Sequence, residues 1–123
     1  MASIMVVDDE RQTRMMLRQM LERANYEVIE AENGYEAIQT FRKHPADLII
    51  MDLIMPRKEG IETIIEMRSE FPYAKIIAMS GGGRVSPTTY LDIAAKLGAL
   101  RTLSKPIERE VLLNNIREIL EYH

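Results

Sequence analysis

Five polar residues draw attention because each follows a short apolar run of the kind that forms a buried strand. They are Asp8, Asp9, Asp52, Ser80 and Lys105. In an open sheet of parallel strands, functional groups gather at the carboxyl ends of the strands, near the point where the strand order switches. The sequence therefore predicts that three carboxylates, one hydroxyl and one ammonium group converge on one edge of a sheet.

Three carboxylates in such a cluster repel one another. At an effective dielectric constant near 20, each pair at about 4 Å costs on the order of 4 kcal/mol. Either the carboxyl pKa values rise or a cation binds between the groups. A donor set made of oxygen alone, without His or Cys, favours a hard ion, so Mg2+ is the expected cofactor, with Mn2+ as an alternative.

The same residues are equipped for phosphoryl transfer. Asp52 can attack phosphorus as a nucleophile, while Lys105 and the metal ion can neutralise the equatorial oxygens of the transferred group. The hydroxyl of Ser80 can donate a hydrogen bond to the product. We therefore expect Asp52, Lys105 and Ser80 to carry the reaction.

Short apolar runs alternate five times with longer amphipathic segments, the pattern of an α/β fold with a parallel sheet covered on both faces. The expected strands are residues 4–7, 26–31, 48–51, 75–79 and 100–104. The expected helices are residues 12–24, 34–44, 61–71, 87–97 and 111–120. Gly98 is placed to end the fourth helix. The nine methionines follow apolar faces and are expected to fill the core.

Length and composition fit a single domain, residues 1–123, with no output domain. The formal net charge is −3 and no basic stripe is present, so direct binding to nucleic acid is not expected. The chain contains no cysteine, which excludes disulfides and thiolate ligands. No apolar segment approaches the roughly 20 residues needed to cross a bilayer, and the N-terminus lacks a secretory signal. We therefore expect a cytoplasmic protein without a membrane partner.

Five short motifs occur in an order and spacing that are specific to one family. They are Val6–Glu10, Asp52–Pro56, Met79–Gly81, Gly98–Ala99 and Lys105–Pro106. With these motifs the chain resembles, along its whole length, the receiver domains of bacterial two-component response regulators, including the chemotaxis regulators. The resemblance implies a flavodoxin-like (βα)5 fold, a doubly wound sandwich whose five parallel strands run in the order 2-1-3-4-5.

The resemblance also implies a role for each site residue. Asp52 would be the phosphoacceptor. Asp9 would bind Mg2+ directly, Asp8 would act largely through water, and Ile54 would supply its backbone carbonyl. The hydroxyl of Ser80 and the ammonium group of Lys105 would contact the phosphoryl group.

Receivers of this kind accept their phosphoryl group from a sensor histidine kinase or a histidine phosphotransfer protein. The resemblance therefore implies a signalling switch. Phosphorylation would alter the surface around the fourth helix, the fifth strand and the fifth helix for a downstream protein effector. Such a protein catalyses only its own phosphorylation and dephosphorylation, and we expect a monomer or a weak dimer.

Three features depart from the usual family pattern. Thr102 stands three positions before Lys105, where an aromatic residue is usual, so a switch based on an aromatic rotamer is not expected there. The stretch from Ser80 to Gly98 is longer than usual. Ile107 stands where phenylalanine is frequent, a change expected to affect packing only.

Two alternatives were weighed against the signalling switch. A magnesium-dependent phosphatase with an aspartate nucleophile normally places a second Asp two residues after the nucleophile, where this chain has Ile54. A phosphorylation-independent interaction module on the same fold commonly lacks part of the acidic set, which is complete here. Both alternatives are less favoured than the switch.

Overall fold

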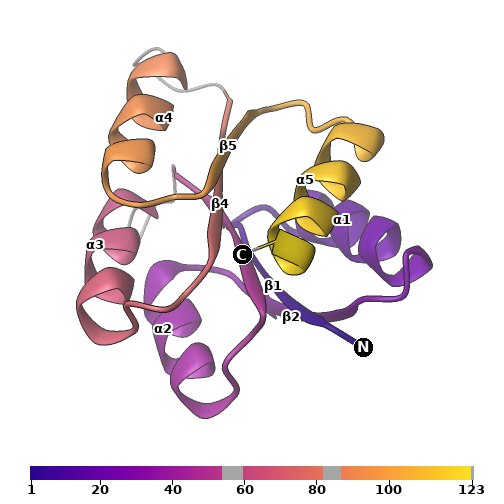
Figure 1. Ribbon diagram of the computed structural model, residues 1–123, viewed down its shortest axis with the longest axis horizontal. Coiled ribbons are helices and arrows are strands. Elements are labelled where there is room, and N and C mark those ends of the chain that lie inside the picture. The colour runs from indigo at the N-terminus through magenta and orange to yellow at the C-terminus, as the bar shows by residue number, and fades with distance from the viewer. Residues whose placement is uncertain (54–59, 82–86, 123) are drawn as a thin grey trace.

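Five strands and five helices alternate along the chain (Figure 1). The computed structural model describes residues 1–53, 60–81 and 87–122, and for residues 87–90 and 122 it describes the backbone only. The strands are β1 (Ser3–Val7), β2 (Glu27–Ala31), β3 (Leu48–Asp52), β4 (Ile76–Ser80) and β5 (Arg101–Ser104). The helices are α1 (Arg11–Arg23), α2 (Gly34–Lys43), α3 (Gly60–Glu70), α4 (Pro87–Lys96) and α5 (Arg109–Tyr122). Each element lies where the sequence predicts it, and the last helix is extended at both ends.

The strands form one parallel sheet in the order β2-β1-β3-β4-β5, which confirms the expected topology. The register pairs Val7 with Met51, Asp52 with Met79, and Ser80 with Ser104. The carboxyl ends of β1, β3, β4 and β5 are therefore level with one another, and the residues that end these strands share one edge.

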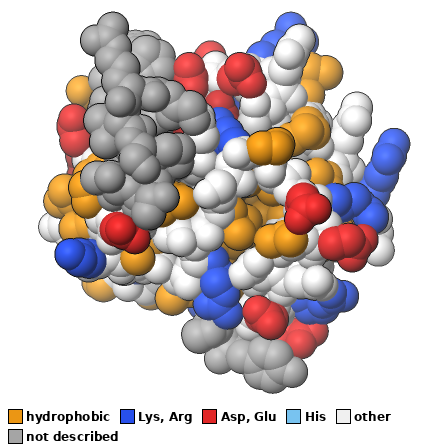
Figure 2. All heavy atoms as spheres, turned by 90° about the horizontal axis from the view of Figure 1, so that it is seen from above, with side chains coloured by type: hydrophobic (Ala, Val, Ile, Leu, Met, Phe, Trp, Pro, Cys, Tyr) orange, Lys and Arg blue, Asp and Glu red, His pale blue; other side chains and the backbone are white. Residues whose placement is uncertain are grey.

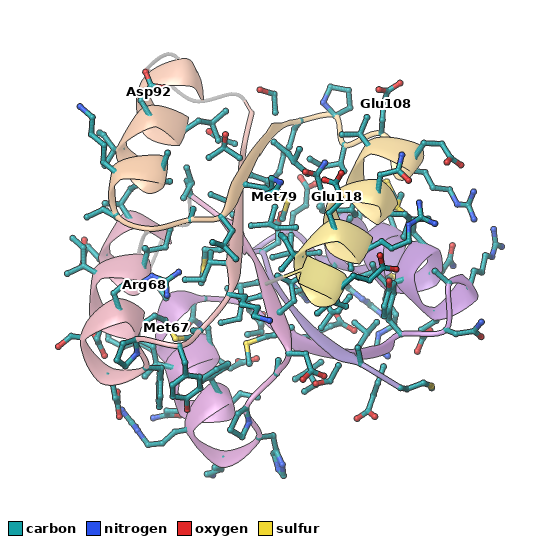
Figure 3. All side chains as sticks on the ribbon, in the orientation of Figure 1. Met67, Arg68, Met79, Asp92, Glu108 and Glu118 are labelled. Atoms are coloured by element: carbon teal, nitrogen blue, oxygen red, sulfur yellow. The ribbon has the colours of Figure 1, made fainter. Side chains whose placement is uncertain are left out.

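Successive residues of a strand point to opposite faces, so one strand can contribute to two separate cores. Ile4 and Val6 of β1 pack with α1 and α5, whereas Met5 and Val7 pack with α2, α3 and α4. Figure 1 shows the same division, with α1 and α5 on one side of the sheet. Figure 3 labels one residue from each core: Met79 beneath α5, and Met67 on α3 facing α2. Burial of each such side chain contributes about 1.5–3 kcal/mol.

Helix α1 packs Leu17, Met20 and Leu21 against the core, but not all of its methionines. Leu17 is fully buried, but Met15 and Met16 are 45% and 44% exposed. The expectation that the methionines fill the core is therefore wrong at these two positions. Arg14 and Arg18 of the same helix pair with Glu30 of β2.

Helix α4 ends as predicted at Gly98, whose φ of 104° lies in the left-handed region. The N–H of Ala99 donates to the carbonyl of Ala94, and the N–H of Gly98 donates to that of Ala95. These two bonds form a Schellman motif, which satisfies carbonyls that the helix end leaves without partners.

No helix in the described part of the chain is long and apolar enough to cross a membrane. Figure 2 shows Lys and Arg side chains scattered among Asp and Glu side chains over the face in view.

Candidate functional site

The residues predicted to form a site meet at the carboxyl edge of the sheet. Asp8 follows β1, Asp52 ends β3, Ser80 ends β4 and Lys105 follows β5. Asp8, Asp52 and Ser80 are buried, with exposed fractions of 0%, 4% and 0%, whereas Asp9 is exposed. One carboxylate oxygen each from Asp8, Asp9 and Asp52 lies within 4.8 Å of the other two, so the expected acidic cluster is present.

Lys105 supplies a positive charge within this cluster. Its Nζ lies 3.0 Å from Oδ2 of Asp8 and 3.5 Å from Oδ2 of Asp52. Burial lowers the pKa of the Lys105 ammonium group, but the charges of Asp52 and Asp8 and their hydrogen bonds raise the pKa by more, so the net shift is upward. The ammonium group therefore stays protonated at neutral pH, as charge neutralisation of a phosphoryl group requires.

The two adjacent aspartates differ in how far their oxygens are already engaged. Oδ1 of Asp8 accepts a hydrogen bond of 2.9 Å from the N–H of Glu10, and Oδ2 accepts one from Lys105. Asp9 forms no hydrogen bond or ion pair with the other described residues. Its carboxylate is therefore more open to an incoming ion than that of Asp8.

Charge balance favours a cation at this edge. Asp8 and Asp52 each pair with Lys105, and the carboxylate of Asp9 lies close to both, so three acidic groups are concentrated at this edge. Mg2+ binds through carboxylates and retained waters, so the oxygen-only donor set fits this ion. Asp8, Asp9 and Asp52 are the side chains that would hold it. The carbonyl of Ile54, the remaining expected ligand, lies outside the described residues.

Ser80 gives independent support for a polar ligand. Its Oγ is buried and has no hydrogen-bond partner in the described structure. A buried hydroxyl left without a partner costs about 1–3 kcal/mol, and such groups in native proteins call for an explanation. An oxygen atom of a phosphoryl group on the neighbouring strand end would accept the missing bond.

Two glycines permit the close packing around the site. A Cβ atom at Gly60 would lie 2.2 Å from the carbonyl oxygen of Asp52 and 2.6 Å from Cα of Leu53. A Cβ atom at Gly81 would lie 2.4 Å from Cβ of Lys105. Gly81 belongs to a motif seen in the sequence, but Gly60 was missed, because only the folded chain reveals how close α3 comes to the end of β3.

The departures from the family pattern have different outcomes. Thr102 is partly buried in β5 and pairs with Ala78 in the strand register. Ile107 is partly buried and packs against the core beneath α1 and α5, in line with the expectation of a packing change. The lengthened stretch after Ser80 includes residues 82–86, which lie outside the described residues.

The fold and the site together define a receiver domain. The sequence model of the response regulator receiver domain matches residues 4–117, and the chain belongs to this family. Receiver domains are signalling switches rather than classical enzymes. They receive phosphoryl groups from histidine kinases and act on downstream effectors.

Chemotaxis regulators are among the proteins to which the chain is similar. It is 35% identical to the chemotaxis protein CheY of Bacillus subtilis over 118 residues, which cover 95% of this chain and 96% of that protein. The crystal structure of CheY4 from Vibrio cholerae matches with a TM-score of 0.85 and 32% identity, covering 98% of this chain and 99% of that one. The response regulator TrrA of Thermotoga maritima, solved in complex with Mg2+-BeF, matches with a TM-score of 0.86 and 32% identity, covering 98% and 100%.

Proposed function

We propose that this chain is a phosphorylation-dependent signalling switch in which Asp52 accepts the phosphoryl group in a Mg2+-dependent reaction. One observation carries the proposal: the buried Asp52 carboxylate lies 3.5 Å from Nζ of Lys105 and within reach of the carboxylates of Asp8 and Asp9. A nucleophile, a fixed cation and a set of metal ligands thus occupy one edge of the sheet.

In the proposed reaction, a carboxylate oxygen of Asp52 forms a bond to phosphorus while the bond from phosphorus to the donor breaks. The electron pair of that bond leaves with the donor. Lys105 neutralises part of the charge on the equatorial oxygens, and Ser80 donates its hydroxyl proton to one of them in a hydrogen bond. Asp8, Asp9 and Asp52 would hold Mg2+, which would supply further charge compensation when bound.

The acyl phosphate adds negative charge at the end of β3 and gives Ser80 a partner. The change can reach β5, because the N–H of Lys105 donates to the carbonyl of Ser80 over 2.9 Å. From β5 it can reach α5, because Arg101 of β5 pairs with Glu118 of α5 at 3.5 Å. Figure 3 labels Glu118 on α5. We therefore propose that phosphorylation shifts the population of two surface states around α4, β5 and α5.

The proposed partners follow from this chemistry. The donor would be a sensor histidine kinase or a histidine phosphotransfer protein, and the surface around α4, β5 and α5 would bind a downstream protein effector. A phosphorylation-independent interaction module on the same fold is the alternative. Three features favour the switch: the buried Asp52 carboxylate, the lysine beside it, and the Ser80 hydroxyl, which has no hydrogen-bond partner among the described residues.

The test uses acetyl phosphate as a small donor, with and without Mg2+, followed by intact mass measurement. We expect one phosphoryl adduct on the wild-type protein in the presence of Mg2+ and none on Asp52→Asn. An Asp47→Asn variant, altered at the opposite edge of the sheet, should be labelled like the wild type. A folded wild-type protein that acquires no adduct would favour the interaction module.

A further inference from the structure

Two arginines of α1 and one glutamate of β2 form a network next to the site. Nε of Arg14 lies 3.0 Å from Oε1 of Glu30, and Nε of Arg18 lies 2.6 Å from Oε2 of the same carboxylate. The side chain of Arg14 is 11% exposed, compared with 34% for Arg18. Glu30 thus holds both guanidinium groups against the sheet, and Arg14 is the more deeply enclosed.

Only one of the two arginines reaches the acidic cluster in the described structure. Nη1 of Arg14 donates a hydrogen bond of 2.8 Å to the backbone carbonyl of Asp8. Arg18 instead contacts Glu22 on its own helix and the carbonyl of Val28 on β2. Both arginines therefore pair with Glu30, but only Arg14 of the two contacts the backbone of the acidic cluster.

The carbonyl that Arg14 holds belongs to the peptide unit that joins Asp8 to Asp9. A peptide unit is planar, so fixing its oxygen also fixes the direction in which Cα of Asp9 lies. On the other side, the N–H of Asp8 donates to the carbonyl of Ala31 over 3.1 Å. The backbone that carries both aspartates is therefore anchored to α1 and β2 before any ion arrives.

We propose that Arg14, oriented by Glu30, is a positioning residue for the Mg2+ site, because it fixes the Asp8–Asp9 peptide and so pre-organises the Asp9 carboxylate. This inference rests on the proposed function. Arg14 touches neither the ion nor the phosphoryl group. Arg14 already fixes the backbone between Asp8 and Asp9. Mg2+ binding therefore has to order less of the backbone.

The charge of Arg14 acts in the opposite direction, which makes the inference testable. A cation near three carboxylates weakens Mg2+ binding, so a role in charge alone predicts tighter binding when Arg14 is neutralised. Positioning predicts weaker binding. Arg14→Lys separates the two effects further, because lysine keeps the charge but cannot hold Glu30 and the Asp8 carbonyl at once with a planar fork of donors.

The experiment measures the Mg2+ dissociation constant by isothermal titration calorimetry on the full chain without a phosphoryl donor. The variants are Arg14→Lys and Arg14→Gln, with Arg18→Lys and Arg18→Gln as matched controls that alter the same Glu30 network. Loss of an outer residue that orients a ligand typically costs 10–100-fold in metal affinity. We expect about 10-fold weaker binding in both Arg14 variants and little change in the Arg18 variants.

Hydrogen exchange of metal-free protein supplies a readout that a general stability role would not produce. Exchange in the Asp8–Glu10 segment should be faster in Arg14→Lys than in Arg18→Lys. Equal affinities in matched Arg14 and Arg18 variants, or tighter binding in Arg14→Gln, would overturn the inference while leaving the proposed function intact. A wild-type protein without measurable Mg2+ affinity would overturn both.

Discussion

The two edges of the sheet use polar residues in opposite ways. At the amino edge, Asp47 accepts a hydrogen bond of 2.8 Å from the N–H of Ser3. Arg68, labelled on α3 in Figure 3, donates to the carbonyls of Pro72, Ala74 and Gly98 and so ties α3 to the loops that lead into β4 and β5. These groups hydrogen-bond to other protein groups, although Nε of Arg68 is buried without a hydrogen-bond partner among the described residues.

At the carboxyl edge, acidic groups are concentrated around one lysine. Lys105 pairs with Asp8 and Asp52, Asp9 lies close to both carboxylates, and the buried Oγ of Ser80 has no partner among the described residues. Buried polar groups are normally satisfied, and exceptions concentrate at functional sites. The contrast fits the proposed function, in which the bonds at the amino edge stabilise the fold and the carboxyl edge would hold a metal ion and a phosphoryl group.

The largest effect is expected at Gly60, where the carboxyl edge is most tightly packed. A Cβ atom there would overlap the backbone of Asp52 and Leu53, which cannot turn aside as a flexible side chain can. Gly60→Ala should lower the free energy of unfolding by about 3 kcal/mol or more, measured by urea denaturation. The exposed Glu62→Ala on the same helix should change it little. An unchanged urea midpoint in Gly60→Ala would mean that the end of β3 tolerates displacement.

Arg68→Met tests whether the amino edge serves stability alone. The variant keeps an unbranched apolar side chain but leaves three carbonyls without their donor, so we expect a loss of about 2–3 kcal/mol. The rise in Tm on addition of Mg2+ should match that of the wild type. Arg42→Met, which breaks an exposed pair with Glu70, is the control and should have a smaller effect. If Mg2+ no longer raised the Tm of Arg68→Met, the amino edge would contribute to the metal site as well as to stability.

Removing one carboxylate from each edge should have opposite effects on stability. Asp9→Asn relieves repulsion within the acidic cluster and should raise stability without Mg2+ by on the order of 1 kcal/mol, while reducing the stabilisation by Mg2+. Asp47→Ala removes the acceptor for Ser3 and should lower stability by about 1 kcal/mol, with the Mg2+ response retained. Thermal unfolding with and without Mg2+ measures both. Destabilisation by Asp9→Asn in metal-free protein would contradict the account of the carboxyl edge.

The smallest expected effect is that of Glu30 on the stability of the protein, and this effect depends on pH. Burial raises the pKa of the Glu30 carboxyl, but hydrogen bonds from Arg18 and Arg14 and their charges lower it by more, to below its ordinary value of 4.5. Because the folded-state pKa is the lower one, the stabilisation is present above about pH 4.5 and is lost as pH falls through the folded-state value.

Glu30→Gln should therefore be less stable than the wild type at neutral pH, by less than about 1 kcal/mol. The two stability curves should converge below pH 4.5. Urea denaturation of both proteins across the acid range measures the difference. A gap that stays constant through the acid range would show that the charge on Glu30 contributes nothing.

The sequence predicted the elements and the principal site residues, because both depend on local patterns. Apolar runs such as Leu48–Met51 mark strands directly, and the topology then brings their ends together. Contacts between distant segments could not be predicted. The approach of Gly60 to Asp52 and the bond from Arg14 to the Asp8 carbonyl depend on the path of the chain in three dimensions.

The central claim is that Asp52 itself accepts the phosphoryl group. The direct test is to treat the protein with acetyl phosphate and Mg2+, reduce it with borohydride, and map the peptides by mass spectrometry, because reduction converts an aspartyl phosphate into homoserine. The account predicts homoserine at position 52 alone. Homoserine at Asp8 or Asp9, or a stable phosphate ester on Ser80, would contradict it.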